Sequence, residues 1–256
     1  MAGEDAAREG VACAASTAWE GAGAAGEGAA RKGAGKPTFL SFDIDTLDAH
    51  CHLHHDPFFF QFALENPRWH FFCMSEMPDE FQAFSSGSAQ ALELPQNAIL
   101  GLGLHPWKVS ENAELTRAQA HNVIQLLSNT WLVGEIGLDF TSRYEHTREN
   151  QLFAFREIAD ACAHAGNKVL SIHAVKAAGQ ALDILEETGC LDSCTCIFHW
   201  FSGTGDELTR ARNAGCYFSF GPRALRTKRG RAYAAQLPPN RVLHESDAFA
   251  VSELQG

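Results

Sequence analysis

No apolar run in this sequence is long enough to cross a membrane, and basic side chains are scarce. A membrane-spanning helix needs about 18 consecutive apolar residues, so a membrane span is excluded. The chain has 20 Lys and Arg against 31 Asp and Glu, which gives a formal net charge of -11. Affinity for nucleic-acid phosphates comes mainly from Lys and Arg, so a histone-like or architectural DNA-binding role is disfavoured. Binding of DNA at a cation-loaded site is compatible with this charge.

The eight cysteines include no Cys-x-x-Cys pair, the spacing found in many metal-binding and redox sites. In a sequence with 45% apolar residues, we expect these cysteines to be reduced and mostly buried. Glu20 and Glu27 interrupt the N-terminal region, which has no apolar segment typical of a secretory signal. These features predict a cytoplasmic protein.

Composition divides the chain into two parts. Residues 1–36 contain 13 Ala and 8 Gly, and this Gly content is too high for a stable helix. We expect this part to form an Ala/Gly-rich flexible tail. The remaining residues, 37–256, suit a single globular domain.

From Pro37 onwards, short apolar runs alternate with longer amphipathic stretches. The candidate strands are residues 39–47, 69–74, 98–104, 131–136, 168–173, 195–199, 216–220 and 241–245. The candidate helices are residues 79–85, 116–128, 148–165, 176–188, 206–213 and 223–236. This alternation, with near-continuous apolar strands, indicates a parallel sheet whose faces are covered. Eight such units favour an α/β fold of the (β/α)8 TIM-barrel type, with a doubly wound sheet as the alternative.

Nine residues follow Asp247, so we expect the barrel to lack its final outer helix. The outward apolar residues of the first and eighth strands, in 39–44 and 241–243, would then be uncovered. Exposed apolar patches of roughly several hundred Å2 usually mark an interface. We expect a second copy of the chain, rather than the N-terminal tail, to cover them, which predicts a homo-oligomer.

Ionisable side chains recur at the carboxyl ends of the predicted strands, where functional residues gather in barrels of this type. The side chains at these ends are His50, His52, His105, Glu135, His173, His199 and Asp247. Imidazoles and carboxylates in such numbers are typical divalent-metal ligands, and there are enough for two ions. On a strand, residues two apart point to the same face, so either His50 with His52 or His52 with His54 could chelate a metal.

These residues lie in motifs that resemble the successive motifs of the TatD family of metal-dependent deoxyribonucleases, a family of amidohydrolase-like barrels. The motifs are Asp48-Ala49-His50-Cys51-His52-Leu53, Gly103-Leu104-His105-Pro106-Trp107, Val133-Gly134-Glu135-Ile136-Gly137-Leu138-Asp139, Ile172-His173, His199-Trp200-Phe201-Ser202-Gly203 and Glu245-Ser246-Asp247-Ala248. Their order and spacing match the family over roughly residues 40–250. The resemblance implies a two-metal phosphodiesterase, often with 3′–5′ exonuclease activity.

The resemblance also implies which residues bind metal. One divalent ion would be held by His50, His52 and Asp247, the second by His173 and His199, and Glu135 would bridge the two. Two such ions can lower the pKa of a bridging water enough to supply hydroxide near neutral pH. Four imidazoles suit Zn or Mn, while phosphoryl chemistry often uses Mg.

Three residues are candidates for direct roles in catalysis. Asp247 would accept a proton from the attacking water, and Glu135 would position the metals that activate it. His105 would either donate to a substrate oxygen or cap the loop before Pro106. His54 lies outside the motif, and we expect it in the second layer around the site or facing solvent.

The sequence departs from the family at three places. An Arg usually lies two residues after the fifth-strand His, where this sequence has Val175 followed by Lys176. Phe249 replaces a Pro that is common in the last motif. The family usually continues for some tens of residues to a final helix, whereas this sequence stops at Gly256. The first departure weakens phosphate binding.

A local basic cluster follows the predicted seventh strand, although the chain as a whole is acidic. It consists of Arg223, Arg226, Lys228, Arg229 and Arg231. The cluster could hold a nucleic-acid backbone, or it could be a solvated helix face. Trp107, Trp200 and Phe201 could stack on an unpaired base, although core packing is the commoner fate of such residues.

The sequence therefore predicts a divalent-metal-dependent hydrolase that cleaves phosphodiester bonds of DNA. Hydrolysis of a carboxylic ester, lactone or amide is an alternative, because similar metal barrels carry out those reactions. A non-catalytic binding relic of the fold is the alternative of another class. The missing Arg and the short C-terminus favour the relic, whereas the presence of all six ligand residues disfavours it.

Overall fold

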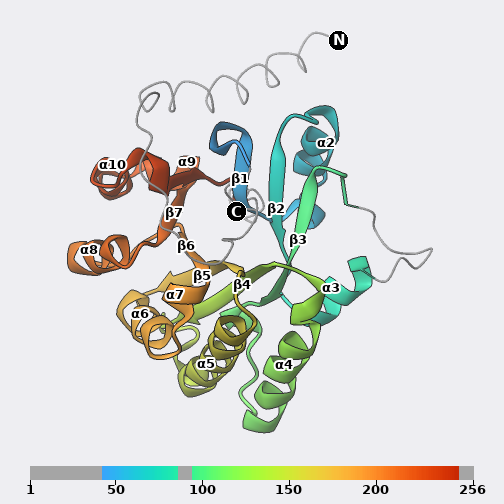
Figure 1. The fold of residues 1–256 in the computed structure, drawn as a ribbon, viewed down its shortest axis with the longest axis vertical. Helices are drawn as coiled ribbons and strands as arrows, with labels where there is room; N and C mark the ends of the chain where they lie inside the picture. Colours follow the sequence, from blue (N-terminus) through green and yellow to red (C-terminus); the bar gives the residue numbers. More distant parts are fainter. Residues whose placement is uncertain (1–41, 86–93, 248–256) are drawn as a thin grey trace. The chain divides into compact units, whose positions relative to one another are not determined.

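The computed structural model describes residues 42–85 and 94–247, and within them eight parallel strands close into a barrel. The strands follow one another around the barrel in chain order, and β8 pairs with β1 through His244 and Asp48. Figure 1 shows the strands around a common centre with the helices outside them. The strands are β1 Leu47–Cys51, β2 His70–Met74, β3 Ala98–Leu104, β4 Leu132–Asp139, β5 Val169–Val175, β6 Thr195–His199, β7 Tyr217–Phe220 and β8 Val242–His244. The barrel is confirmed, and the doubly wound alternative is wrong.

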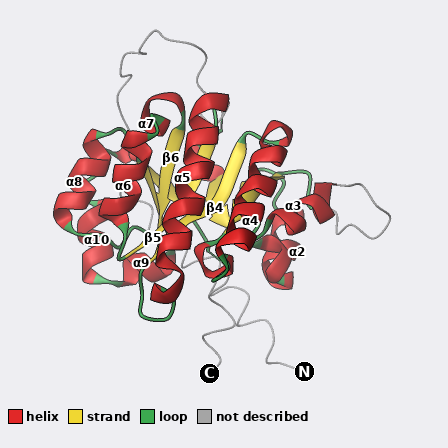
Figure 2. Cartoon of the chain, turned by 90° about the horizontal axis from the view of Figure 1, so that it is seen from below, coloured by secondary structure: helices red, strands yellow, loops and turns green. Residues whose placement is uncertain are grey.

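The helices form the outer layer, and Figure 2 shows α4, α5 and α6 covering the strands behind them. The α-helices are α2 Pro57–Glu65, α3 Pro78–Ser85, α4 Ala113–Leu126, α5 Arg148–Ala165, α6 Ala178–Glu187, α7 Cys190–Ser193, α8 Gly205–Asn213, α9 Pro222–Arg226 and α10 Lys228–Ala234. Short 3-10 turns are η2 Ile44–Thr46, η3 Leu53–His55, η4 Pro106–Lys108, η5 Leu127–Asn129, η6 Glu145–Thr147 and η7 Pro239–Arg241. Among the described residues, the helices are too short or too polar to cross a membrane.

Local sequence signals explain where the helices begin. Thr204 and Glu207 form a capping box at the start of α8, in which each side chain accepts from the other residue's backbone N–H. Asp56 caps α2 by accepting from two backbone N–H groups, and Pro57 occupies the first helical position, where no N–H is needed. At both helix starts, nearby polar side chains satisfy backbone N–H groups that have no partner within the helix.

The barrel interior is apolar at one end and polar at the other. In β5, the inward positions change from Val169 in the core, through Ser171, to His173 at the carboxyl end. The apolar end consists of Leu47, Ala49, Phe72, Met74, Leu132, Val169, Ile197 and Leu243. Each fully buried side chain of Leu or Phe size contributes about 1.5–3 kcal/mol, so this layer supports the polar layer above it.

The expected first strand, residues 39–47, is wrong in its position. Residues 39–41 lie outside the described residues, and Asp43 caps the turn η2 by accepting from the backbone N–H of Asp45. Phe42 then packs against Phe72 and Trp131, with ring centroids 5.5 and 6.2 Å apart. Phe42 and Ile44 therefore pack against the apolar end of the barrel, and the strand begins at Leu47.

Other boundaries also differ from the prediction. β4 continues to Asp139 and β5 to Val175, each beyond the end of its apolar run. The expected helix over 223–236 is two helices, α9 and α10, and the sequence analysis did not predict α2 or α7. The expected tail in residues 1–36 and the chain after Asp247 lie outside the described residues.

Candidate metal centre

The carboxylate of Glu135 lies at the centre of the polar layer, and imidazoles from β1, the β3 loop, β5 and β6 surround it. Glu135 is 2% exposed, so its charge is compensated by these neighbours rather than by water. The distances to its two oxygens are 3.3 Å from His50 Nε2, 3.2 Å from His52 Nε2, 3.0 Å from His105 Nε2, 2.7 Å from His173 Nδ1 and 2.8 Å from His199 Nε2. One carboxylate thus links most of the residues singled out in the sequence.

The remaining predicted ligand, Asp247, lies beside His50 on β1 and His52, which follows that strand. Its carboxylate, His50 and His52 offer ligand atoms that all lie within 4.8 Å of one another. The backbone N–H of Asp247 donates to the carbonyl of His50 at 3.1 Å, which ties the end of β8 to β1. All six residues predicted to bind metal therefore meet at the carboxyl ends of the strands, where their role as ligands stays a prediction.

Gly137 allows β4 and β5 to approach each other closely at this level. It pairs with His173 in the sheet, and its φ of 138° is a conformation that favours glycine. A Cβ at this position would lie 2.0 Å from the carbonyl oxygen of His173. The glycine between Glu135 and Asp139 therefore allows both carboxylates to reach the imidazole on the neighbouring strand.

The neighbours of the imidazoles fix which ring nitrogen faces Glu135. His52 Nδ1 lies 3.0 Å from the carbonyl oxygen of Met74, which can only accept, so Nδ1 carries the proton and, in the neutral ring, Nε2 has the lone pair. His173 Nε2 lies 3.2 Å from Asp139 Oδ2 in the same way, which leaves Nδ1 facing Glu135. A histidine that binds metal usually donates its other N–H to such an acceptor.

His105 is held in the opposite protonation pattern. Its Nδ1 accepts from the backbone N–H of Trp107 at 3.0 Å, so in the neutral ring Nε2 carries the proton and donates to Glu135. Burial lowers the pKa of His105, which keeps the ring neutral. His105 therefore caps the loop before Pro106 while its Nε2 faces the centre, and donation to a substrate oxygen stays a prediction.

Burial and neighbouring charges shift the pKa values of several groups in the centre. Burial would raise the pKa of Glu135, but the imidazoles of His105, His199 and His50 hold it well below its usual range. Burial and the neighbouring His199 lower the pKa of His50 to about 4. Burial opposes protonation of His173 as well, but Asp139 and Glu135 outweigh it and raise the pKa to about 9. A buried carboxylate surrounded by several imidazoles is a donor set that suits divalent cations.

Three buried acids at this site, Asp48, Asp139 and Glu245, were not predicted from the sequence to have a role. Asp139 lies four residues after Glu135 on β4, so an alternating pattern could have placed both on one face. Asp48 accepts from the backbone N–H groups of His50 and Ser246, and burial raises its pKa to about 8. Glu245 accepts from Ser219 Oγ at 2.6 Å and from the backbone N–H of Trp200 at 3.2 Å.

The aromatic candidates separate into two groups. Phe201 is buried against Phe198 and Phe218, so core packing explains it. Trp107 is 41% exposed and donates through Nε1 to Asp139 at 2.7 Å. Trp200 is half-buried, and the guanidinium of Arg223 lies 5.0 Å from its ring centroid.

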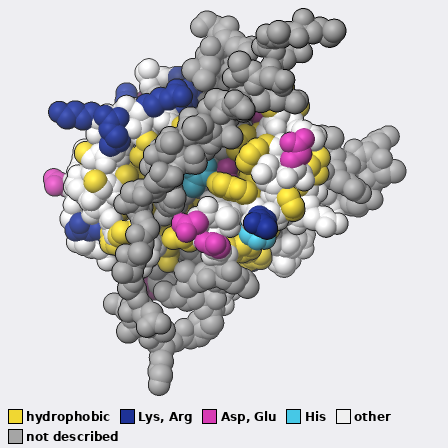
Figure 3. All heavy atoms as spheres, turned by 90° about the horizontal axis from the view of Figure 1, so that it is seen from above, with side chains coloured by type: hydrophobic (Ala, Val, Ile, Leu, Met, Phe, Trp, Pro, Cys, Tyr) yellow, Lys and Arg dark blue, Asp and Glu magenta, His cyan; other side chains and the backbone are white. Residues whose placement is uncertain are grey.

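The basic cluster is partly engaged in structural bonds. Arg229 donates to the carbonyls of Ser202 and Gly203, and Arg231 donates to the carbonyls of Leu225 and Arg226 at 2.9 and 2.8 Å. These two side chains therefore fix α9 and α10 to neighbouring segments. On the face drawn in Figure 3, Lys and Arg side chains are most prominent toward one edge, where an acidic side chain also lies.

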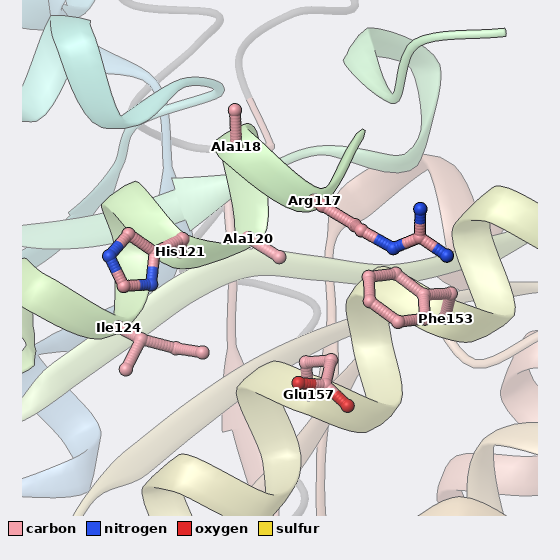
Figure 4. A pocket seen from close by; sticks show the side chains of 7 residues that line it. All are labelled: Arg117, Ala118, Ala120, His121, Ile124, Phe153 and Glu157. Carbon is pink, nitrogen blue, oxygen red and sulfur yellow. The ribbon is translucent and has the colours of Figure 1, made fainter. Parts of the chain in front are cut away.

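A surface hollow of about 480 Å3 lies away from this centre, between α4 and α5 (Figure 4). Arg117 and His121 on α4 line it together with Phe153 and Glu157 on α5, and Arg117 lies over the Phe153 ring at 5.5 Å. Its lining contains none of the predicted site residues. The hollow is therefore separate from the candidate centre at the strand ends.

Comparison with known proteins matches this arrangement. The profile of the family described as TatD related DNase matches residues 47–252. The chain belongs to the TatD-related DNase family. Two solved structures share the fold: a TatD family hydrolase from Entamoeba histolytica (19% identity, TM-score 0.63, 78% of this chain and 73% of that chain) and YJJV, a TatD homologue from Escherichia coli K12 (20% identity, TM-score 0.64, 78% of each chain).

Two curated relatives match a shorter part of the chain. They are TATDN3 of Mus musculus, 29% identical, and the deoxyribonuclease TATDN3 of Homo sapiens, 27% identical, each over 123 residues. The match covers 46% of this chain and 40% and 43% of the relatives, so the chain spans less than half the length of either. The predicted membership of the TatD family is confirmed.

One departure from the TatD pattern, the missing Arg after the fifth-strand His, falls within the described residues. Val175 is the last residue of β5, and the exposed Lys176 follows it with a φ of 54°. Lys176 therefore offers a positive charge one residue beyond the position where the family usually has Arg. Phe249 lies outside the described residues.

Proposed function

We propose that this TatD-family chain is a divalent-metal-dependent deoxyribonuclease, that it acts as a 3′–5′ exonuclease, and that residues 37–256 carry the activity. The main support is the Glu135 carboxylate with imidazole nitrogens around it, because this donor set suits cations that bind phosphates. The name of the human relative, a deoxyribonuclease, supports the same substrate.

Six residues would hold two divalent ions, which we take to be Mg, Mn or Zn. His50, His52 and Asp247 would hold one ion, His173 and His199 the other, and Glu135 would contact both. When bound, two such ions activate a water molecule as nucleophile and neutralise the non-bridging oxygens of the phosphate. The donor set is compatible with this assignment because the neutral forms of His52 and His173 each have a lone pair on the nitrogen that faces Glu135, which a bound ion would use.

The chain's own side chains would then orient the substrate and move protons. Asp247 would accept the proton of the attacking water, since its carboxylate lies beside His50 and His52. His105 presents an N–H held by its bond to the Trp107 backbone, and it would donate to a substrate oxygen. Trp200, under the guanidinium of Arg223, would stack on a base at the strand end.

A cleavage assay tests the proposal. Purified protein is treated with a chelator, the chelator is removed, and a 5′-labelled single-stranded oligonucleotide is added with Mg, Mn or Zn. We expect no cleavage without metal, stepwise shortening from the 3′ end with metal, and no activity in Glu135→Ala. Cleavage of nitrophenyl esters without cleavage of DNA would replace the deoxyribonuclease with an esterase, and inactivity on both with metal bound would support a binding relic.

We also propose a cytoplasmic location and a homo-oligomer. The seven cysteines in the described residues are all free, as reduced thiols in the cytoplasm are. On α2, Phe58 is 87% exposed and Phe62 is 37% exposed, one turn apart, which leaves an apolar helix face in solvent. Light scattering should give a mass above that of one chain, and Phe58→Ser should lower it, whereas a monomeric wild type would contradict the assembly.

A further inference from the structure

A second group of metal-binding side chains lies beside the candidate centre and shares no residue with it. His54 and His55 belong to the turn η3 that follows β1, and Glu80 lies on α3, which follows β2. His54 Nε2 is 2.6 Å and His55 Nε2 is 3.3 Å from Glu80 Oε1. Ligand atoms of the three residues all lie within 4.8 Å of one another.

The two oxygens of Glu80 have separate roles. Oε2 accepts from the backbone N–H of Glu76 at 2.6 Å, which fixes the carboxylate at the start of α3. Oε1 then faces both imidazoles. A carboxylate held in this way can offer one oxygen to a bound cation without a further loss of side-chain conformational entropy.

The neighbours of His54 orient the ring for binding through Nε2. Its Nδ1 lies 3.4 Å from Cys73 Sγ, and the Phe84 ring packs against it with centroids 5.3 Å apart. The side chain is only 3% exposed, and within the described residues its buried Nε2 makes no hydrogen bond of normal geometry despite its short distance to Glu80. Both atoms lie close enough to contact one shared cation, to which the nitrogen would supply its lone pair.

We propose that His54, His55 and Glu80 bind one further divalent cation, of the zinc type, with water completing the coordination. Zinc is commonly bound by two His and one Glu with a water in the fourth position, and bonds of about 2.0–2.1 Å place tetrahedral ligands roughly 3.3 Å apart. The His55–Glu80 distance of 3.3 Å already has this value, and the His54–Glu80 distance must lengthen from 2.6 Å to roughly 3.3 Å. Two nitrogen donors favour zinc over magnesium, which takes oxygen ligands.

Such an ion would tie the β1 loop to α3. His52 begins the same turn, and its carbonyl accepts from the N–H of His55 at 3.0 Å. The rings of His54 and His55 each have their centroid 6.2 Å from that of His52. Fixing His54 and His55 would therefore fix the backbone that presents His52 to the centre around Glu135.

Zinc stoichiometry tests the proposal. Chelated protein is dialysed against buffered zinc, and bound metal is counted by mass spectrometry for wild type, His55→Ala and Glu80→Gln. His55 has a side chain that is 37% exposed, so its loss should leave the fold intact. We expect each variant to bind one zinc fewer per chain, or to hold that ion more than about tenfold more weakly. Even the loss of a residue that only hydrogen-bonds to a metal ligand lowers metal affinity by about 10–100-fold.

The control is another His–Glu pair. His146 Nε2 lies 3.2 Å from Glu111 Oε1 on the exposed surface, and His146→Ala should bind as much zinc as wild type. Co(II) titration in Glu135→Gln separates this site from the main centre, because visible absorption bands should persist there and disappear when His55→Ala is added. Equal zinc content and affinity in wild type, His55→Ala and Glu80→Gln would overturn the proposal and leave His54 and Glu80 as an ion pair only.

Discussion

Replacing Asp139 with Asn should weaken metal binding, although Asp139 is not one of the proposed ligands. Asp139 Oδ2 accepts from His173 Nε2 at 3.2 Å and from Trp107 Nε1 at 2.7 Å, and Oδ1 accepts from the N–H of Thr141 at 2.8 Å. An Asn side chain has one acceptor and one donor group. In either orientation its NH2 group faces a donor, so one buried bond is lost or His173 changes tautomer.

A change of tautomer would matter most at the proposed metal site. If His173 Nε2 accepts from the Asn amide, Nδ1 carries the proton and no longer offers a lone pair toward Glu135. Loss of a partner that orients a metal-binding His typically costs about 10–100-fold in affinity. This corresponds to about 1.4–2.7 kcal/mol of binding free energy, and DNA cleavage at limiting metal should fall with it.

The measurement is a competition titration of chelated wild type and Asp139→Asn with Zn or Mn against a chromophoric chelator. Asp192→Asn is the matched control, because Asp192 is exposed on α7. We expect only Asp139→Asn to show the loss. The role assigned to Asp139 would be refuted if Asp139→Asn folds and its metal affinity stays within about threefold of wild type. That change is far smaller than the roughly 10–100-fold loss of metal affinity usual for such partners.

Three further predictions concern other parts of the site. Asp247→Asn should lower kcat on DNA by about 10²–10⁴ and change the Kd for DNA little, because proton transfer matters only in the transition state; an unchanged rate with metal bound would contradict this. In metal-free protein, burial raises the pKa of Asp48 to about 8, above its unfolded value, so its contribution to stability is complete at low pH and is lost as pH rises toward 8. Urea titrations of chelated protein measure the free energy of unfolding of Asp48→Asn and of wild type. The value for Asp48→Asn should increase relative to that for wild type from pH 5 to pH 8, by at most about 1.4 kcal/mol per pH unit. A constant difference would be inconsistent with a buried neutral Asp48. Trp200→Ala should raise KM for single-stranded DNA by the equivalent of about 1–3 kcal/mol in steady-state kinetics, with kcat nearly unchanged, and an equal KM would exclude stacking on this ring.

Much of the fold could be predicted because apolar strands and amphipathic helices alternate clearly. β3 and β6 have the predicted bounds, and so does α5, where Phe155, Ile158 and Cys162 recur at helical spacing on the buried side. The strand ends also placed the predicted ligand residues together, since all carboxyl ends of a parallel barrel meet on one side.

The parts that could not be predicted depend on contacts between distant segments. Phe42 has the apolar character of a strand residue, but it plugs the barrel against Phe72 and Trp131. Helix α2 was missed because its aromatic residues show no clear alternation between a buried and a polar face, and Ala63 is its one fully buried residue. Tautomers are likewise absent from sequence patterns, since the proton position in His52 follows from the carbonyl of Met74 on another strand.

The most direct test of the central claim is anomalous diffraction from crystals of the Mn- or Zn-loaded protein. We expect two peaks at the carboxylate of Glu135, each at bonding distance, about 2.0–2.2 Å, from its oxygens. One peak should contact His50, His52 and Asp247, and the other should contact His173 and His199. A protein that cleaves DNA with bound metal, but shows no anomalous peak at Glu135, would contradict the account.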